Sequence, residues 1–238
     1  AQPLPAPAAA ASAVETPDSF FGFRIGTDRL LASADRIERY FEQVASHSPR
    51  VRLLELGATT EGHRTVAALV SSPRQLAELE RIRTANQRLA DPRRLAPAEA
   101  AALARTQPAI VAIGASIHAT EIGGSQALTE LLYRLATAED PETVSTLDQT
   151  ITIVIPILNP DGHRLVTDWY ERQKGTAYEG GPMPWLYHRY AGHDINRDGF
   201  MMNLAESRNL SEFFYGQWHP QVFLTLHQIG RASCRERV

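Results

Sequence analysis

The stretch 108–121, PAIVAIGASIHATE, constrains the fold of this chain more than any other. Its apolar run, residues 110–113, is typical of a short strand that is covered on both faces. Small residues then allow a turn, and His118 and Glu121 stand three apart where a helical pattern begins. Side chains at the carboxyl end of a central strand lie where open α/β sheets bind ligands. The stretch therefore predicts a buried strand that ends in two candidate metal ligands.

Two further apolar runs predict the rest of a central sheet. Residues 151–158, ITIVIPIL, form the second buried strand, and QVFLTLH forms the last one, ending at His227. Helical patterns lie between these strands, and this order along the chain favours an α/β fold. We expect a mixed, mostly parallel central sheet flanked by helices. Adjacent parallel strands end at the same edge of a sheet, which would bring His227 beside His118.

The first hundred residues predict the surrounding elements. An amphipathic helix is expected to begin near Thr27 and to continue through Val44. Two strands follow, VRLLELG and RTVAALVSS, with a tight turn between them. Residues 73–107 are charged and Ala-rich, which favours a helical insertion that is broken at Pro92 and Pro97.

The segments around the second buried strand are less regular. NPDG at 159–162 indicates a turn after that strand. Residues 163–193 are rich in aromatic residues, Gly and Pro, and we expect a long loop there that carries function. A helix is predicted around residues 203–216.

Composition and the chain ends narrow the possible partners and location. The formal net charge of -3 gives no general attraction to nucleic acid, and no apolar run approaches the ~20 residues of a membrane span. Cys234 is the single cysteine, so no intrachain disulfide is possible. Residues 1–17 are Ala/Pro-rich and predict a disordered segment resembling the end left by signal-peptide removal. We therefore expect a secreted or periplasmic protein, the alternative being an arbitrary boundary of the sequence.

The three candidate ligands suit zinc chemistry. Catalytic zinc takes three protein ligands and keeps a position for water or substrate. A bound zinc ion polarises a carbonyl and lowers the pKa of water to about 7. A His-x-x-Glu pair alone is weak evidence, because one such pair arises by chance among 8 histidines. The case for a metal site is stronger here because His118, Glu121 and His227 all follow the ends of predicted strands.

A set of four motifs carries a resemblance to a known family. The motifs are HATE at 118–121, NPDG at 159–162, DINR at 194–197 and FLTLH at 223–227. In this order and spacing the chain resembles a zinc carboxypeptidase of the carboxypeptidase A type, the M14 peptidase family. The resemblance implies that residues 18–228 are the N-terminal part of a zinc-carboxypeptidase catalytic domain. It covers most of residues 51–227, and the insertion at 73–107 is longer than it leads us to expect.

The resemblance also implies roles for individual residues. His118, Glu121 and His227 would hold Zn²⁺. Asp194 would accept a hydrogen bond from the His118 ring and fix its tautomer, the alternative being a turn or helix cap.

The substrate would be the C-terminus of a peptide or protein. Asn196 and Arg197 would bind its terminal carboxylate, because a guanidinium gives paired, charge-assisted hydrogen bonds and an amide adds a donor. A turn residue and a surface salt bridge are the alternatives. Arg172 is the candidate for stabilising the oxyanion, although Arg189 lies in the same segment and either could be an ordinary surface arginine.

The end of the chain departs from the family pattern. The resemblance implies a general-base glutamate on a later strand, beyond His227, and we expect the chain as given to lack activity without it. Residues 229–238, IGRASCRERV, match the translation of a common sequencing-library adapter in one frame. We expect them to be a non-native tail.

Three functions remain open at this point. The first is a fragment of a zinc metallocarboxypeptidase that hydrolyses C-terminal peptide bonds with zinc-activated water. The second is a zinc-binding protein without catalysis. The third is a related zinc amidohydrolase that acts on N-acyl amino acids, against which NPDG and the aromatic segment favour a peptidase.

Overall fold

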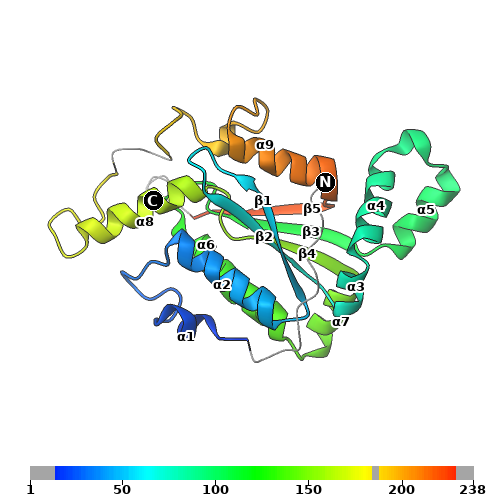
Figure 1. Ribbon diagram of the computed structural model, residues 1–238, viewed down its shortest axis with the longest axis horizontal. Helices are drawn as coiled ribbons and strands as arrows, with labels where there is room; N and C mark the ends of the chain where they lie inside the picture. Colours follow the sequence, from blue (N-terminus) through cyan, green and yellow to red (C-terminus); the bar gives the residue numbers. More distant parts are fainter. Residues whose placement is uncertain (1–13, 184–187, 229–238) are drawn as a thin grey trace, which may run out of the picture.

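The computed structural model of the protein describes residues 14–183 and 188–228, and a five-stranded sheet lies at its centre (Figure 1). The strand order is β1-β2-β4-β3-β5. The strands are β1 (Val51–Ala58), β2 (Arg64–Val70), β3 (Ala109–Ala115), β4 (Thr150–Ile155) and β5 (Val222–Leu226).

The sheet has an antiparallel part and a parallel part. β2 pairs antiparallel with both β1 and β4, whereas β3 pairs parallel with both β4 and β5. The carboxyl ends of β3, β4 and β5 therefore meet at one edge. The predicted α/β fold, a mixed sheet flanked by helices, is confirmed.

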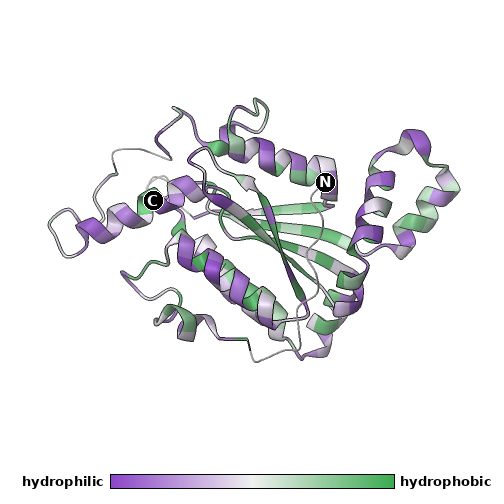
Figure 2. Cartoon of the chain, viewed as in Figure 1, coloured by the Kyte–Doolittle hydropathy of each residue, from purple (hydrophilic) through white to green (hydrophobic). Residues whose placement is uncertain are grey.

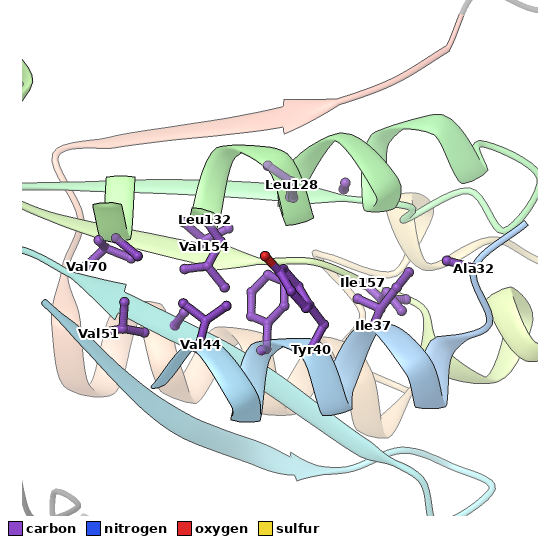
Figure 3. Close-up of a cluster of buried hydrophobic side chains, with 14 of the residues drawn as sticks. Ala32, Ile37, Tyr40, Val44, Val51, Val70, Leu128, Leu132, Val154 and Ile157 are labelled. Carbon is purple, nitrogen blue, oxygen red and sulfur yellow. The ribbon is translucent and has the colours of Figure 1, made fainter. Parts of the chain in front are cut away.

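One face of the sheet is covered by four helices, and Figure 3 shows the core beneath them. Tyr40, Ile37 and Val44 of one helix pack towards Leu132 and Val154, and all five are fully buried. Burial of side chains of this size stabilises the fold by about 1.5–3 kcal/mol each. The four helices are α1 (Pro17–Phe21), α2 (Ala34–His47), α6 (Ile122–Thr137) and α7 (Pro141–Gln149).

A second core lies on the opposite face of the sheet. There Ile110 and Ile153 of the central strands belong to one buried cluster with Ile82, Phe213 and Trp218. The helices that contribute to this core include α3 (Pro73–Ala77), α4 (Leu79–Ala90), α9 (Ala205–Ser211) and the π-helical segment η3 (Glu212–Trp218). Figure 2 shows the resulting contrast between apolar central strands and helices with hydrophilic outer faces. Because both faces are covered, β3 is apolar throughout and β4 is interrupted only by Thr150 and Thr152.

The helical insertion has the predicted breaks. It consists of α3 (Pro73–Ala77), α4, a short 3-10 turn η1 (Pro92–Arg94) and α5 (Pro97–Thr106). Pro92 and Pro97 each begin a new element, as expected for a residue that favours the first helical turn. α5 buries none of its residues and lies away from the sheet in Figure 1.

Two predicted boundaries were wrong. The first long helix begins at Ala34 and not near Thr27, because Ser33 is extended and the preceding loop contains Gly26 in a left-handed conformation. NPDG does not form a turn but begins the helix α8 (Pro160–Gln173). The side chain of Asn159 accepts a hydrogen bond from the Gly162 amide at 2.9 Å, and proline occupies the first helical position. The irregular segment expected from residue 163 therefore begins only after residue 173.

β5 differs from the other parallel strands in its exposure. Among the described residues it pairs on one side only, with β3. Val222 and Leu224 are 52% and 50% exposed, although the apolar pattern of this strand is typical of an interior position. Within the described ranges no helix has the length and apolar character needed to cross a membrane.

Candidate metal centre

The loop between β3 and α6 places His118 against Glu121. Ser116 adopts a left-handed conformation with φ 51°, and its hydroxyl donates to the Glu121 carbonyl at 2.9 Å. The Glu121 amide donates to the His118 carbonyl at 3.0 Å, which closes the loop into a tight turn. As a result His118 Nδ1 lies 3.1 Å from Glu121 Oε1. The two side chains therefore meet at the carboxyl edge of the sheet.

β5 brings His227 to the same place. Ala115 at the end of β3 pairs with Leu226 at the end of β5, so the next residue, His227, leaves the sheet at the same level. His227 Nδ1 lies 3.2 Å from His118 Nδ1 and 2.9 Å from Glu121 Oε2. Gly124 in the first turn of α6 allows close packing against these strand ends, since a Cβ there would lie 3.0 Å from the Cβ of Ala115 and 3.6 Å from that of Leu226.

The spacing of these three side chains fits a metal ion. Ligand atoms placed 2.0–2.1 Å from a tetrahedral zinc lie about 3.3 Å from one another. Here the two Nδ1 atoms are 3.2 Å apart, and each lies 2.9–3.1 Å from a different oxygen of the Glu121 carboxylate. Two imidazole nitrogens that face each other can share only one proton, whereas a cation accepts both lone pairs at once. We call this group, His118 with Glu121 and His227, the metal cluster.

Asp194 lies on the outer side of this cluster. Its Oδ2 is 3.8 Å from His118 Nε2, the ring nitrogen that faces away from the other two ligands. Asp194 is 6% exposed, and within the described part of the chain its Oδ1 has no hydrogen-bond partner. A carboxylate in this position matches the outer partner that metal-ligating histidines usually have.

Asn196 and Arg197 follow directly in the short 3-10 turn η2 (Ile195–Arg197). Both side chains are exposed. Asn196 lines a small hollow of about 150 Å³ together with Ile117, the residue before His118, and Phe223. No hydrogen bond or ion pair with another described residue engages the Arg197 guanidinium. Both side chains are thus open to solvent in the turn that follows Asp194.

Arg172 lies elsewhere in the described fold. It is exposed in the last turn of α8, a helix that projects away from the sheet in Figure 1. Its guanidinium lies 6.0 Å from the ring centroid of Trp169, one turn earlier. Arg189, the alternative, forms a bidentate pair with Glu61 at 2.9 Å for both contacts. The structure brings neither arginine into contact with the metal cluster, and the oxyanion role of Arg172 stays a prediction.

Sequence reasoning missed a second group of potential ligands, Glu61, His63 and Asp161, which we call the second cluster. Asp161 Oδ1 accepts from Thr59 Oγ1 at 2.6 Å and contacts His63 Nδ1 at 2.7 Å, while Oδ2 accepts from the Glu61 amide at 3.0 Å. Burial raises the pKa of the Asp161 carboxyl, but the hydrogen bonds from Thr59, His63 and Glu61 outweigh it and leave the pKa below its usual value. The aspartate of NPDG could have been singled out in the sequence, but its partners from the β1–β2 turn could not.

Comparison with known proteins places the chain in a family. The M14 peptidase family model, described as zinc carboxypeptidase, matches residues 37–222, well over half of the chain. The matched range includes His118, Glu121 and Arg197 but stops before His227. Among curated proteins, none matches this chain.

Solved structures of carboxypeptidases share the fold. A metallo-carboxypeptidase from Pseudomonas aeruginosa has 18% identity and a TM-score of 0.54, over 84% of this chain and 40% of its own. A metallo-carboxypeptidase from Burkholderia cenocepacia has 17% identity and a TM-score of 0.54, over 84% of this chain and 42% of its own. Carboxypeptidase A from Helicoverpa armigera has 13% identity and a TM-score of 0.55, over 90% of this chain and 52% of its own.

This chain therefore spans between 40% and 52% of the length of those three solved chains. Similarity at such identity establishes the fold, whereas the family follows from the match over residues 37–222. On that match, this chain belongs to the M14 family of zinc carboxypeptidases.

Proposed function

We propose that the chain forms part of a metallocarboxypeptidase in which His118, Glu121 and His227 hold a zinc ion. The observation that carries this proposal is the convergence of two Nδ1 atoms and one carboxylate within 2.9–3.2 Å of one another. These donors suit zinc, which binds imidazole and carboxylate at about 2.0–2.2 Å. The M14 family match supports the same metal.

The chemistry that zinc supplies in a three-ligand site is Lewis-acid polarisation of a carbonyl and activation of water. The contribution of Asp194 would be to orient the His118 ring, since its carboxylate faces the ring nitrogen that is turned away from the other ligands. A charged partner there also favours the tautomer in which Nδ1 carries the lone pair.

Asn196 and Arg197 would position the substrate. A peptide carboxylate beside Arg197 gains charge-assisted hydrogen bonds, and the amide of Asn196 adds a donor. Such an anchor would place the last peptide bond at the metal cluster, which adjoins η2 through the contact of His118 with Asp194. Arg172 would stabilise the oxyanion only if the end of α8 came closer than it lies here.

The general base is still expected to lie outside residues 1–238, and the lack of activity in this chain alone is likewise a prediction. A missing general base lowers the rate by about 10²–10⁴-fold. Export from the cytoplasm is a further proposal, which rests on the Ala/Pro-rich start of the sequence. Fractionation of cells that produce the protein would test that location.

The function is tested by substrate anchoring in protein made from the complete reading frame. Arg197→Ala should reduce turnover of peptides with a free C-terminus by about 2–5 kcal/mol in kcat/KM, the loss expected when one partner of a buried charge pair is removed. Zinc content should stay unchanged. Arg93→Ala is the matched control, because Arg93 pairs with Asp91 in the helical insertion and should not affect these substrates.

Amidated peptides distinguish the remaining functions. A carboxypeptidase should fail on C-terminally amidated peptides, and equal activity on both forms would show that no carboxylate is bound. Zinc binding without hydrolysis of any peptide would support the non-catalytic alternative. Hydrolysis of N-acyl amino acids but not of peptides would support an amidohydrolase.

A further inference from the structure

One fully buried histidine lies outside both clusters. His163 stands in the first turn of α8, directly after NPDG. Its Nε2 lies 2.9 Å from the hydroxyl of Ser125, which is also fully buried. Ser125 belongs to the first turn of α6, the helix that Glu121 precedes. This contact therefore joins α8 to the turn that carries a candidate metal ligand.

The hydrogen bonds of Ser125 determine the tautomer of His163. A serine hydroxyl has one hydrogen to donate, and Ser125 donates it to the Ile122 carbonyl at 2.8 Å. The hydroxyl oxygen must then accept from the imidazole, which places the ring proton on Nε2. The opposite tautomer would lose one of the two hydrogen bonds of Ser125. It would also put a proton on Nδ1, which has no hydrogen-bond partner among the described residues.

The imidazole of His163 is also kept neutral. Burial, with a smaller contribution from the neighbouring charge of Arg164, lowers the pKa of His163 to about 3. At neutral pH the ring therefore carries no charge and donates a single hydrogen bond, from Nε2 to Ser125.

The first turn of α6 needs support from neighbouring elements. The residues after Glu121 include Gly123 and Gly124, and glycine in a helix loses more backbone entropy on folding than alanine does. A larger residue at Gly124 is excluded, because its Cβ would lie 3.0 Å from that of Ala115. Hydrogen bonds from outside the helix must therefore help to fix the peptide groups next to Glu121.

Two contacts from the start of α8 flank the segment 117–125. At the beginning of this segment, the side chain of Asn159 donates to the Ile117 carbonyl at 3.4 Å. At its end, His163 contacts Ser125 at 2.9 Å. The two candidate ligands of the loop between β3 and α6 lie between these contacts, so the start of α8 supports the loop on both sides.

We infer that His163 is a positioning residue for the metal cluster, and that it fixes the orientation of Glu121 through the hydroxyl of Ser125. The inference rests on the proposed function, in which Glu121 binds zinc. The effect reaches Glu121 through two successive hydrogen bonds, from His163 to Ser125 and from Ser125 to the Ile122 carbonyl. Loss of the first should weaken zinc binding by about 3–10-fold, less than the roughly 10–100-fold usual for a direct partner of a ligand.

The test compares two substitutions of similar length in protein from the complete reading frame. His163→Gln keeps an N–H at nearly the reach of Nε2, whereas His163→Met has a side chain of the same length without a donor. Competition with a chelator of known affinity measures the zinc dissociation constant. His163→Met should weaken zinc binding by about 3–10-fold, and His163→Gln should stay close to the wild type.

Ser125→Ala removes the other partner, and it decides the question if His163→Met does not fold. It should weaken zinc binding as much as His163→Met does. Ser71→Ala is the matched control, because Ser71 is fully buried and its hydroxyl contacts the carbonyls of Leu147 and Thr150, at 2.8 and 2.6 Å, at the amino end of β4. Ser71→Ala should lower the thermal stability and leave the zinc dissociation constant unchanged.

The tautomer gives a readout that does not depend on zinc affinity. In ¹⁵N-labelled protein, NMR near neutral pH should show a protonated Nε2 and an unprotonated Nδ1 for His163, with or without zinc. The loss of this signal in His163→Gln identifies it. A proton on Nδ1 in place of Nε2 would overturn the inference, because the ring could not donate to Ser125.

The outcomes separate this inference from the proposed function. If the wild type binds no zinc at the metal cluster, the proposed function fails and the inference fails with it. If the wild type binds zinc and neither His163→Met nor Ser125→Ala changes the dissociation constant, the proposed function stands and the inference is overturned. Equal weakening in His163→Met and His163→Gln would also overturn it, because lost packing would then explain the effect.

Discussion

The metal cluster and the second cluster contain the same kinds of side chain, but the two clusters differ in the hydrogen-bond partners of their carboxylates. In each, three potential ligand atoms lie within 4.8 Å of one another. In the second cluster, protein donors already occupy the carboxylates: Thr59, His63 and the Glu61 amide contact Asp161, and Arg189 pairs with Glu61. In the metal cluster, the short contacts join the ligand atoms to each other.

The hydrogen-bond partners of each cluster decide which of the two can bind a cation. A metal at Asp161 would have to displace three hydrogen bonds from a carboxylate that is 3% exposed. Breaking the one from Thr59, which is buried, would leave an unsatisfied donor at a cost of about 1–3 kcal/mol, whereas the other two are partly exposed. A metal at His118 and His227 would instead relieve the contact between two facing nitrogen atoms. Proximity of ligand residues is thus a weaker criterion than the partners that those residues already have.

The largest expected effect is the loss of zinc from the metal cluster. His118→Ala and His227→Ala should each reduce the zinc content from about one ion per chain to nearly none, because a three-ligand site loses one ligand. His63→Ala removes a histidine from the second cluster, and this variant should keep the zinc ion of the metal cluster. Metal analysis of the purified variants makes the comparison. Zinc retained in both His118→Ala and His227→Ala would show that these two histidines do not hold it.

A smaller loss is expected when the outer carboxylate changes. Asp194→Asn should weaken zinc binding by about 10–100-fold, the usual effect of removing the partner of a metal-ligating histidine. Competition with a chelator of known affinity measures this change. An unchanged dissociation constant would show that the 3.8 Å contact between Asp194 and His118 has no role in metal binding.

The second cluster should affect stability and not zinc. Asp161→Asn should lower the free energy of unfolding at pH 7 by about 1–3 kcal/mol, because partners of a buried carboxylate are left unsatisfied. The pKa of Asp161 is lowered from 3.8 in the folded state, so its contribution is present above that value and is lost as the pH falls through the folded-state pKa.

The difference between wild type and Asp161→Asn should therefore be constant near neutral pH and shrink below pH 3.8. Denaturant unfolding at several pH values, with zinc content as a parallel measurement, tests this. A large loss of zinc in Asp161→Asn would contradict the contrast between the two clusters.

The smallest effect is expected at the rim of the second cluster. Glu61→Gln removes the ion pair with Arg189, whose side chain is 54% exposed. Exposed pairs contribute about 0–1 kcal/mol, so both stability and zinc content should remain close to the wild type. A loss of zinc here would show that Glu61 is a metal ligand after all.

The sequence was informative where local patterns decide the structure. Apolar runs predicted the strands that became β3 and β4, because side chains covered on both faces leave no polar alternation. The carboxyl ends of β3 and β5 also predicted that His118, Glu121 and His227 would lie together, and the structure brings them together. Whether they bind zinc stays a prediction.

Some features could not be predicted from the sequence. The start of α2 and the helix that begins at NPDG are two of them, because Asn, Asp and Ser favour both turns and helix N-caps. The pair of Arg29 with Glu179 and the partners of Asp161 join residues about a hundred or more positions apart. No local pattern marks such pairs, because tertiary packing decides them.

The most direct test of the account is to locate zinc in crystals of the protein by anomalous scattering at the zinc absorption edge. One peak is expected, about 2.0–2.2 Å from Nδ1 of His118, Nδ1 of His227 and a carboxylate oxygen of Glu121. No peak is expected between Glu61, His63 and Asp161. A zinc ion at that second cluster, or none at the first in zinc-saturated crystals, would contradict this assignment.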